Sequence, residues 1–409
     1  MDEVVSTLIP GNESHIPVQL DEMDAAWLTQ ALRRDGHLTT GKVSEVRIEP
    51  IGEGEGFMGV LGRFHLEYEG DAGNSPVSLI VKLPSLTDSN RMLGELMGAY
   101  WREIHFYEEL SSGVGVNTPA VYYSNLTPDP VRPRINMIMR VVEMMPSWLV
   151  DIVMERSKEV VGASEHRYVL LIEDLSPAKP GDQLQGGTPE RCEAVLSVAA
   201  KMHAHNWQSP ILDSAFWIND PRVTMRSRHQ MLLESRESFV EKYSEKMGDW
   251  GMILMNWYYD NGVQLHRLLY RRAPHTVVHG DMRLDNVFFD ETSSDTRVVF
   301  ADWQTVGRGL AAEEVAYFLS GALDVDTSAE IEEDLIRHYH SELVNAGVNN
   351  YDFERFRKDY DRGMMAMLRV HGSATIDVDV GEERGGELMN IWMDRTLARL
   401  RSVDLTTLL

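Results

Sequence analysis

Polar and apolar residues alternate along three stretches near the start of the chain, at 43–51, 60–68 and 77–83. Strict alternation places every second side chain on one face, as in a β-strand with one buried face. The apolar run 168–172 is typical of a fully buried strand. Tyr122 and the segment 135–142 also have strand-like composition. The pattern therefore predicts an antiparallel sheet within the first 175 residues.

Apolar residues recur at helical spacing elsewhere, which predicts helices at 20–35, 89–110, 225–246 and 250–270. Asp21 is the expected N-cap of the first helix. Thr188 and Pro189 begin another helix, because a capping hydroxyl is followed by proline at the first helical position. The segment 144–162 is also predicted to be helical after its proline. A helix packed beside the sheet is the simpler interpretation of it, and a lid or dimer contact is the alternative.

The 409 residues carry a formal charge of −25, and 43% of them are hydrophobic. The apolar content is enough for a large core, and the acidic balance argues against nucleic acid as a partner, since such partners require basic patches. Cys192 is the only cysteine, which excludes an intrachain disulfide and fits a reducing cytoplasm. We find no signal peptide and no apolar run long enough for a membrane span. We therefore expect a cytoplasmic protein.

Two acidic segments follow short β-branched runs, where strands end and loops begin: HGDMRLDN at 279–286 and DWQ at 302–304. Asp281 can accept a proton from a hydroxyl nucleophile, and Asn286 and Asp302 can offer oxygen atoms to one divalent cation. Mg²⁺ prefers such hard oxygen ligands. The spacing therefore predicts phosphoryl transfer, in which positioning and charge neutralisation provide most of the catalysis. A polar hairpin with structural aspartates is the alternative.

These two segments together resemble the catalytic loop and metal-binding segment of the aminoglycoside phosphotransferase and choline kinase superfamily. The closest resemblance is to its ecdysteroid kinase-like branch, also called CHK kinase-like. It implies an α+β, bilobal protein-kinase-like fold, with a small β-sheet lobe at 1–175 and a large, mainly helical lobe at 176–409. It also implies ATP and Mg²⁺ as cofactors. Glu173, Asp174 and Leu175 match the interlobe hinge, where backbone groups bind the adenine edge.

The predicted small lobe has two further features of a nucleotide site. Gly54, Gly56 and Gly59 lie in a glycine-rich turn between two predicted strands. Glycines there would let backbone amides approach phosphate oxygens, although a flexible hairpin turn is the alternative. Lys82 shares a strand face with Ile80 and resembles the strand-three lysine of kinases. A lysine on an edge strand facing solvent is the alternative.

Glu103 falls among apolar residues on one face of the helix predicted at 89–110. A carboxylate on such a face needs a partner, because an unpaired buried charge is costly. We therefore predict an ion pair between Lys82 and Glu103, with Glu103 at the helix margin as the alternative. His203 resembles a family position that packs under the catalytic loop, and we expect a structural role. Family members commonly carry Asp where Glu314 stands, and no role is assigned to Glu314.

Taken with the resemblance, the residues predict transfer of the γ-phosphate of ATP to a hydroxyl group of a small molecule, by a monomer or homodimer. Asp281 would orient or deprotonate the acceptor, and Arg283 would contact the transferring phosphate or brace the loop through Asp285. Aromatic residues at 250–270 would suit an apolar or ring-bearing acceptor, although helix packing explains them equally well. Antibiotic O-phosphorylation is the alternative within enzymes. A nucleotide-binding scaffold without turnover is the alternative outside them.

Overall fold

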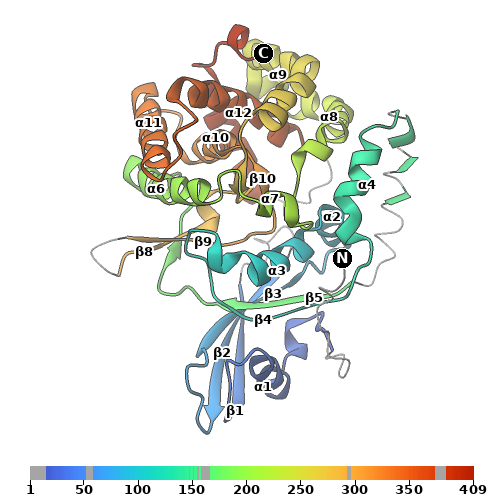
Figure 1. Cartoon of the computed structure of the whole chain (residues 1–409), viewed down its shortest axis with the longest axis vertical. Coiled ribbons are helices and arrows are strands. Elements are labelled where there is room, and N and C mark those ends of the chain that lie inside the picture. The colour runs from blue at the N-terminus through green and yellow to red at the C-terminus, as the bar shows by residue number, and fades with distance from the viewer. Residues whose placement is uncertain are drawn as a thin grey trace.

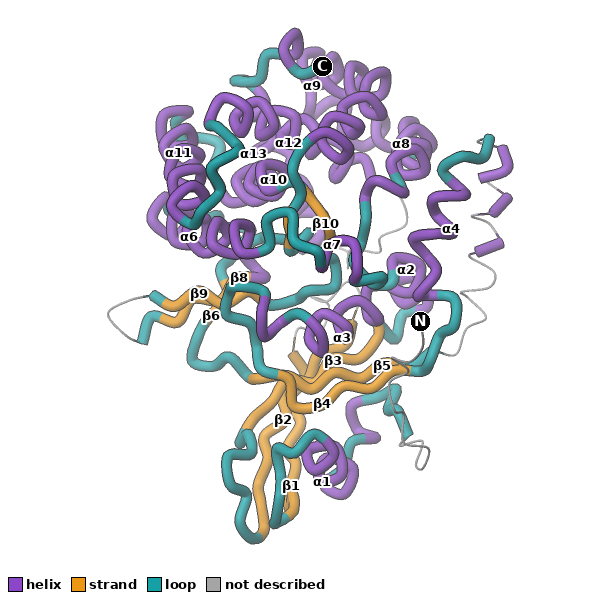
Figure 2. The backbone as a smooth tube through the Cα atoms, viewed as in Figure 1, coloured by secondary structure: helices purple, strands orange, loops and turns teal. Residues whose placement is uncertain are grey.

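The structure, a computed structural model, describes residues 15–51, 59–146, 148–150, 152–153, 156–157, 166–292, 296–373 and 384–409. A small lobe built on a sheet and a larger helical lobe lie one above the other (Figure 1). The colouring by secondary structure shows the longest strands in the small lobe and most of the helices in the large lobe (Figure 2). Within these ranges, no helix has the length and apolar character that crossing a bilayer requires.

The small lobe contains an antiparallel five-stranded sheet in the order β1-β2-β3-β5-β4. The predicted alternation is visible in β3, where every second residue is buried. Leu79, Val81 and Leu83 face the core formed with α1, whereas Ile80 packs on the side of the large lobe. Lys82 therefore points toward the other lobe. The strand bounds are Lys42–Ile51 (β1), Gly59–Glu69 (β2), Ser78–Pro84 (β3), Val121–Leu126 (β4) and Tyr168–Glu173 (β5).

Two predicted helices of the small lobe differ from the structure at their ends. The first, α1 (Ala25–Arg34), is capped by Asp24, whose carboxylate accepts a hydrogen bond from the backbone N–H of Trp27, so Asp21 is not the cap. The second is divided into α2 (Asp88–Met97) and α3 (Ala99–Glu109). Gly98, at φ +66°, separates them, because a left-handed residue ends a helix.

The prediction of a strand at 135–142 is wrong, because this segment forms the helix α4 (Ile135–Val142). In the described part of the sheet β4 is an edge strand, so pairing alone does not exclude a further strand, but the segment contacts the large lobe instead of extending the sheet. Asn136 fixes the helix against the large lobe by donating to the backbone oxygens of Phe216 and Ile218, each at 3.2 Å. Apolar residues on the outer side of α4 therefore remain exposed. Beyond it, the described residues among 148–157 are helical, and the remainder of 144–162 lies outside the described residues.

The large lobe is a bundle of helices around one extensive core. Thr188 caps α6 as predicted, by accepting from the N–H of Arg191. The helix predicted at 225–246 ends early, because α8 stops at Glu234, and the predicted gap before residue 250 is a kink at Gly248 within α9. The bounds are Pro189–His205 (α6), Ile211–Ser214 (α7), Met225–Glu234 (α8), Arg236–Arg267 (α9), Ala311–Ala322 (α10), Ala329–Asn345 (α11), Phe353–Ser373 (α12) and Arg384–Leu400 (α13).

Two small sheets lie where the lobes meet and hold the acidic segments. The strands β6 (Lys179–Pro180), β8 (Val287–Asp290) and β9 (Arg297–Phe300) form one, and β7 (Thr276–Val278) pairs with β10 (Gly307–Gly309) in the other. The sequence HGDMRLDN runs from β7 to β8, and DWQ lies between β9 and β10. Both segments are therefore anchored at each end by a strand.

Candidate active site

The turn at Gly280 brings the first acidic segment close to the second. Gly280 has φ +84°, and a Cβ atom there would lie 2.4 Å from the backbone oxygen of Thr305. Only glycine fits this position, because any side chain would meet both backbone strain and that oxygen. The Thr305 hydroxyl donates in turn to the backbone oxygen of His279, at 3.1 Å. The two segments are thus packed backbone against backbone.

Glu314, a buried carboxylate on α10, holds the turn at Gly280 in place. Glu314 accepts hydrogen bonds from the backbone N–H groups of His279, at 3.1 Å, and Gly280, at 2.6 Å. His203 on α6 lies 2.8 Å from Glu314 through Nε2, and its Nδ1 lies 2.6 Å from the Tyr339 hydroxyl. This arrangement agrees with a structural role for His203. It also gives Glu314 a bracing role that sequence reasoning did not assign.

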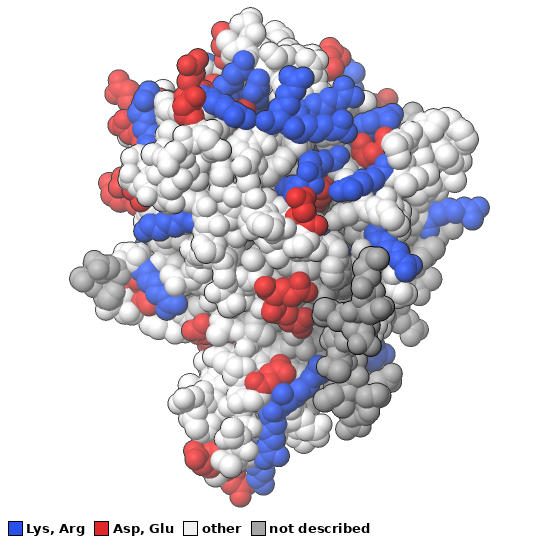
Figure 3. All heavy atoms as spheres, in the orientation of Figure 1, with Lys and Arg blue, Asp and Glu red and all other residues white. Residues whose placement is uncertain are grey.

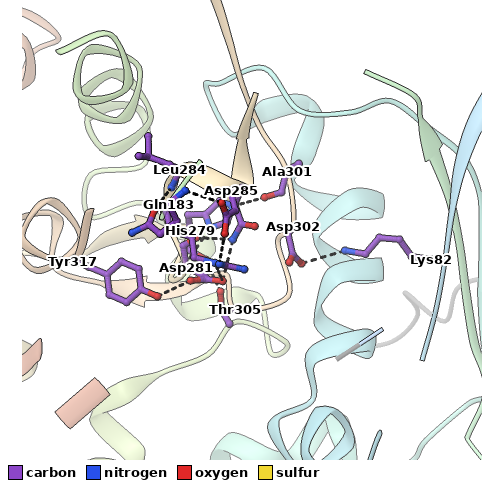
Figure 4. Close-up of polar contacts among 12 residues, drawn as sticks. Lys82, Gln183, His279, Asp281, Leu284, Asp285, Ala301, Asp302, Thr305 and Tyr317 are labelled. Carbon is purple, nitrogen blue, oxygen red and sulfur yellow. Dashed lines mark hydrogen bonds and ion pairs between the residues drawn. The ribbon is translucent and has the colours of Figure 1, made fainter. Parts of the chain in front are cut away.

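Asp281 receives hydrogen bonds on both carboxylate oxygens (Figure 4). The Tyr317 hydroxyl donates to Oδ1 at 2.5 Å, and the Asn286 amide donates to Oδ2 at 3.0 Å. Burial and the neighbouring Asp281 carboxylate raise the pKa of Tyr317 well above its ordinary value, so the phenol keeps its proton and donates. Tyr317 was not predicted as a site residue. It lies 36 residues from Asp281, and no local pattern connects the two.

Asn286 and Asp302 are brought together through the backbone. The N–H of Ala301, the residue before Asp302, donates to the backbone oxygen of Asn286 at 2.9 Å. The Asn286 amide nitrogen also donates to the backbone oxygen of Asp281, so its side-chain oxygen is left to accept. One such oxygen and a carboxylate suit Mg²⁺, which typically takes one or two protein ligands and completes its shell with phosphate and water. Among the described residues, no group of three His, Cys, Asp or Glu side chains could hold a metal without other ligands.

Asp302 has an unusual backbone conformation, with φ +64°. Aspartate adopts the left-handed region more readily than most residues, and such conformations cluster at functional sites. The next residue, Trp303, is fully buried and stacks on Phe106 of α3 with ring centroids 4.1 Å apart. This contact sets the position of Asp302 relative to α3, which also carries Glu103.

Lys82 connects the small lobe to both of these carboxylates. Its ammonium lies 2.5 Å from Glu103. It also lies 3.1 Å from Asp302, and this second contact is drawn in Figure 4. The predicted pair with Glu103 is thus present in the structure. Burial disfavours the charge on Lys82, but Asp302 and Glu103 outweigh it and raise the pKa of the ammonium. Burial would raise the pKa of Asp302, but Lys82 outweighs it and lowers that pKa below its usual range.

Arg283 faces carboxylates of its own loop. Its guanidinium lies 2.7 Å from Asp285 and 3.4 Å from Asp281. Burial works against its charge, but these two carboxylates raise the pKa of Arg283. Asp285 also accepts from the backbone N–H of Gln183, whose side-chain oxygen accepts from the N–H of Leu284. Of the two predicted roles for Arg283, this geometry matches the bracing of the loop.

The residues predicted as the hinge, 173–175, lie at the lobe boundary. Glu173 ends β5, and Asp174 and Leu175 continue toward β6 and the large lobe, so the three residues form the link between the lobes. Asp174 is held by Arg63 of β2 at 2.9 Å. Gly59 begins β2 opposite Pro84, whereas Gly54 and Gly56 lie outside the described residues.

Comparison with known proteins agrees with this architecture. The profile of the ecdysteroid kinase-like family matches residues 131–348, more than half of the chain. No curated protein matches the sequence. An aminoglycoside 2'-phosphotransferase solved with GDP has a similar structure, with a TM-score of 0.51 and 12% identity over 93% of this chain and 100% of that one. A choline kinase from Cryptosporidium parvum has a TM-score of 0.47 and 10% identity, over 89% of this chain and 91% of that one. The first likeness shows that the predicted α+β kinase-like fold is correct.

Proposed function

Since the chain belongs to the ecdysteroid kinase-like family, we propose that it transfers the γ-phosphate of ATP to a hydroxyl group of a small molecule. The observation that carries this proposal is the convergence of Asp281, Asn286, Asp302 and Lys82 at the meeting of two strand-anchored loops. Asp281 is hydrogen-bonded to Asn286, and Lys82 is ion-paired with Asp302. Asn286 is joined to Asp302 through Ala301, the residue before it. A structural polar hairpin would not need a lysine from the other lobe.

Asp281 is assigned as the group that orients the acceptor hydroxyl and takes its proton. The hydrogen bonds from Tyr317 and Asn286 hold its carboxylate in one orientation. A positioned general base contributes about 10²–10⁴-fold in rate. Asn286 and Asp302 would hold Mg²⁺, which supplies charge neutralisation on the phosphates when bound. Arg283 keeps the loop in place through Asp285.

The small lobe would hold the nucleotide. Lys82 would bind phosphate oxygens while Glu103 keeps the ammonium in position, and the turn that contains Gly54, Gly56 and Gly59 would cover the triphosphate. The adenine would contact the backbone of the link at 173–175. In this assignment, residues 1–175 form the nucleotide-covering lobe, and residues 176–409 form the lobe with the catalytic loop and acceptor pocket. The requirement for ATP suits the cytoplasm, where the buried thiol of Cys192 would remain reduced.

We propose an apolar or ring-bearing acceptor, with antibiotics as the alternative. Only some of the aromatic residues of α9 are placed where they could contact such an acceptor. Tyr258 and Tyr259 are buried in the helical core, whereas Trp250 remains 38% exposed under the guanidinium of Arg401. A panel of sterols, hydroxyacids, amino sugars and macrolides, each incubated with labelled ATP, would decide between these classes. Expression in a sensitive host and a measurement of resistance would test the antibiotic alternative directly.

The experiment that tests the proposed activity compares the wild type with Asp281→Asn in that panel. Asp260→Asn is the matched control, since Asp260 is an exposed carboxylate on α9. We expect Asp281→Asn to lower kcat by about 10²–10⁴-fold and the control to match the wild type. Chelation of Mg²⁺ should abolish transfer, and added Mg²⁺ should restore it. A wild type that binds ATP but phosphorylates no acceptor would favour the scaffold. Transfer that persists undiminished in Asp281→Asn would refute the role of Asp281 as the group that takes the proton.

A further inference from the structure

A cavity with a basic lining lies between α4 and the ends of two helices of the large lobe. It has a volume of about 360 Å³ and is formed by α4, the turn before α8, the start of α8 and the end of α9 with the turn that follows. Cavities of about 300–1,000 Å³ hold small ligands in proteins. None of Lys82, Asp281, Asn286 and Asp302 lines it, so it is distinct from the phosphoryl-transfer site.

The charge of the lining is opposite to that of the whole protein. Five of its side chains are arginines, against one acidic residue, Glu143, in a chain with a formal charge of −25: Arg140, Arg222, Arg226, Arg267 and Arg271. On the face shown in Figure 3, Lys and Arg side chains gather over the part of the helical lobe where α8 and α9 lie. Like charges repel, so this concentration of arginines raises the electrostatic free energy of the folded protein. A bound anion would reduce this repulsion.

The acidic groups near the cavity are already committed to other partners. The Glu143 carboxylate accepts from the backbone N–H groups of Arg226, at 2.9 Å, and Ser227, at 3.0 Å, and so caps the start of α8. Arg222 pairs with Asp220 at 2.6 Å. Within the described part of the chain, no carboxylate oxygen lies within 4.0 Å of the side-chain nitrogens of Arg140, Arg267 or Arg271. These three exposed guanidinium groups are therefore available to an incoming anion.

The rest of the lining is apolar. Met144, Val223, Met225 and Val263 contribute to the walls. Met144 is 76% exposed and continues into the exposed apolar side of α4. Methionine side chains adapt to irregular apolar ligands. A simple inorganic anion would bind to the arginines but leave these apolar walls in contact with water. The cavity therefore suits a ligand that has both an anionic group and an apolar part.

We propose that this cavity binds an amphiphilic anion, a small molecule with an apolar body and a carboxylate, sulfonate, sulfate or phosphate group. The anionic group binds to Arg140, Arg267 and Arg271, whose planar guanidinium groups match such oxygens in pairs. The apolar body contacts Met144 and Val263. This site goes beyond the proposed function, because it would exist whether or not the chain transfers phosphate.

Calorimetric titration of the full chain with two matched pairs of probes tests the proposal: naphthalene-2-sulfonate against naphthalene-2-methanol, and decanoate against decanol. We expect each anion to bind with one site per chain and at least 10-fold more tightly than its neutral partner. Inorganic sulfate and phosphate should bind at least 10-fold more weakly than naphthalene-2-sulfonate. Neutral probes that bind as tightly as the anions, inorganic ions that bind as tightly as the amphiphiles, or no binding of either anion would each overturn the proposal.

Variants locate the site without reference to kinase activity. Arg267→Glu/Arg271→Glu changes two exposed arginines of the cavity, and we expect it to weaken anion binding at least 10-fold. Met144→Asn, which removes apolar surface without adding charge, should also weaken it, through the apolar wall. The control is Lys201→Glu/Lys358→Glu, which makes the same change in charge at two exposed lysines of α6 and α12. Equal weakening in the control would show a general effect of charge and refute the assignment, and unchanged binding in the cavity variants would refute it as well.

Discussion

Replacement of Lys82 by Met tests how strongly the two lobes are connected. The change removes the ammonium that lies 2.5 Å from Glu103 and 3.1 Å from Asp302. The Glu103 side chain is only 4% exposed, whereas that of Asp302 is 36% exposed. Water can therefore compensate Asp302, but Glu103 would be left as an uncompensated buried charge. Removing one partner of a buried pair typically costs about 3–5 kcal/mol.

Protonation of Glu103 limits this cost and makes it depend on pH. Taking up a proton at pH 7 on a carboxyl group with an ordinary pKa of about 4.3 costs about 3.7 kcal/mol, and at pH 5 about 1 kcal/mol. The contributions of Lys82 and Asp302 in the wild type do not change in this window, whereas burial, opposed by Lys82, raises the pKa of Glu103 already in the wild type, and any proton that the wild type takes up there reduces the difference. The raised pKa of Lys82 contributes stability below its unfolded value of about 10.4, and the lowered pKa of Asp302 contributes above its unfolded value of about 3.9. The loss should therefore be smaller at pH 5 than at pH 7, by at most about 2.7 kcal/mol.

Urea unfolding followed by tryptophan fluorescence at both pH values measures these differences. In Lys82→Met/Glu103→Gln the buried carboxylate is gone, so the difference from the wild type should no longer become smaller between pH 7 and pH 5. Lys42→Met is the matched lysine control, because Lys42 pairs with Glu69 on the exposed side of the sheet, and little change is expected. A loss in Lys82→Met that is equal at both pH values would refute the reasoning.

Three substitutions in the large lobe give further predictions. Gly280→Ala should destabilise the protein by about 3 kcal/mol or more, from strain plus a backbone clash, whereas Gly73→Ala, with φ +56° and open space around it, should cost about 1–2 kcal/mol in thermal unfolding. Glu314→Gln should lower stability by about 1–3 kcal/mol, because the amide oxygen can accept from only one of the two backbone N–H groups and the NH₂ group faces the other, and unchanged stability and kcat would contradict the bracing role. Tyr317→Phe should lower kcat about 10-fold with little change in the KM for ATP, since only the orientation of Asp281 is lost.

Local patterns in the sequence predicted the parts of the site that are held by neighbouring residues. Alternation in β3 placed Lys82 on the face toward the large lobe. The helical spacing of Glu103 placed this carboxylate on an apolar face, where it needs a partner such as Lys82. Both inferences use geometry within a single element. Membership in the family and the kinase-like fold were recognisable from the two loop segments, because their residues lie within a few positions of each other.

Contacts between distant elements could not be predicted in the same way. Glu314 and Tyr317 reach the catalytic loop from α10 because that helix packs beneath it, and no periodicity in the sequence encodes this. The segment 135–142 has the composition of a strand but forms a helix that Asn136 holds against the large lobe, so tertiary context decided its conformation. The basic cavity is drawn from several separate elements of the chain, and the overall charge of −25 would suggest the opposite character.

The contacts around the candidate site differ in kind between the two lobes. In the large lobe, Asp281 is held by a turn that only glycine allows and by Glu314, whose hydrogen bonds are buried. Such contacts fix the loop before any ligand arrives, which is the condition for catalysis by positioning. Across the lobes, by contrast, Lys82 reaches Asp302 through one partly exposed contact at 3.1 Å. Phosphate oxygens and a cation would each compete for one partner of this contact. The pair with Glu103 would then keep Lys82 in place, while the interlobe contact gives way to the nucleotide.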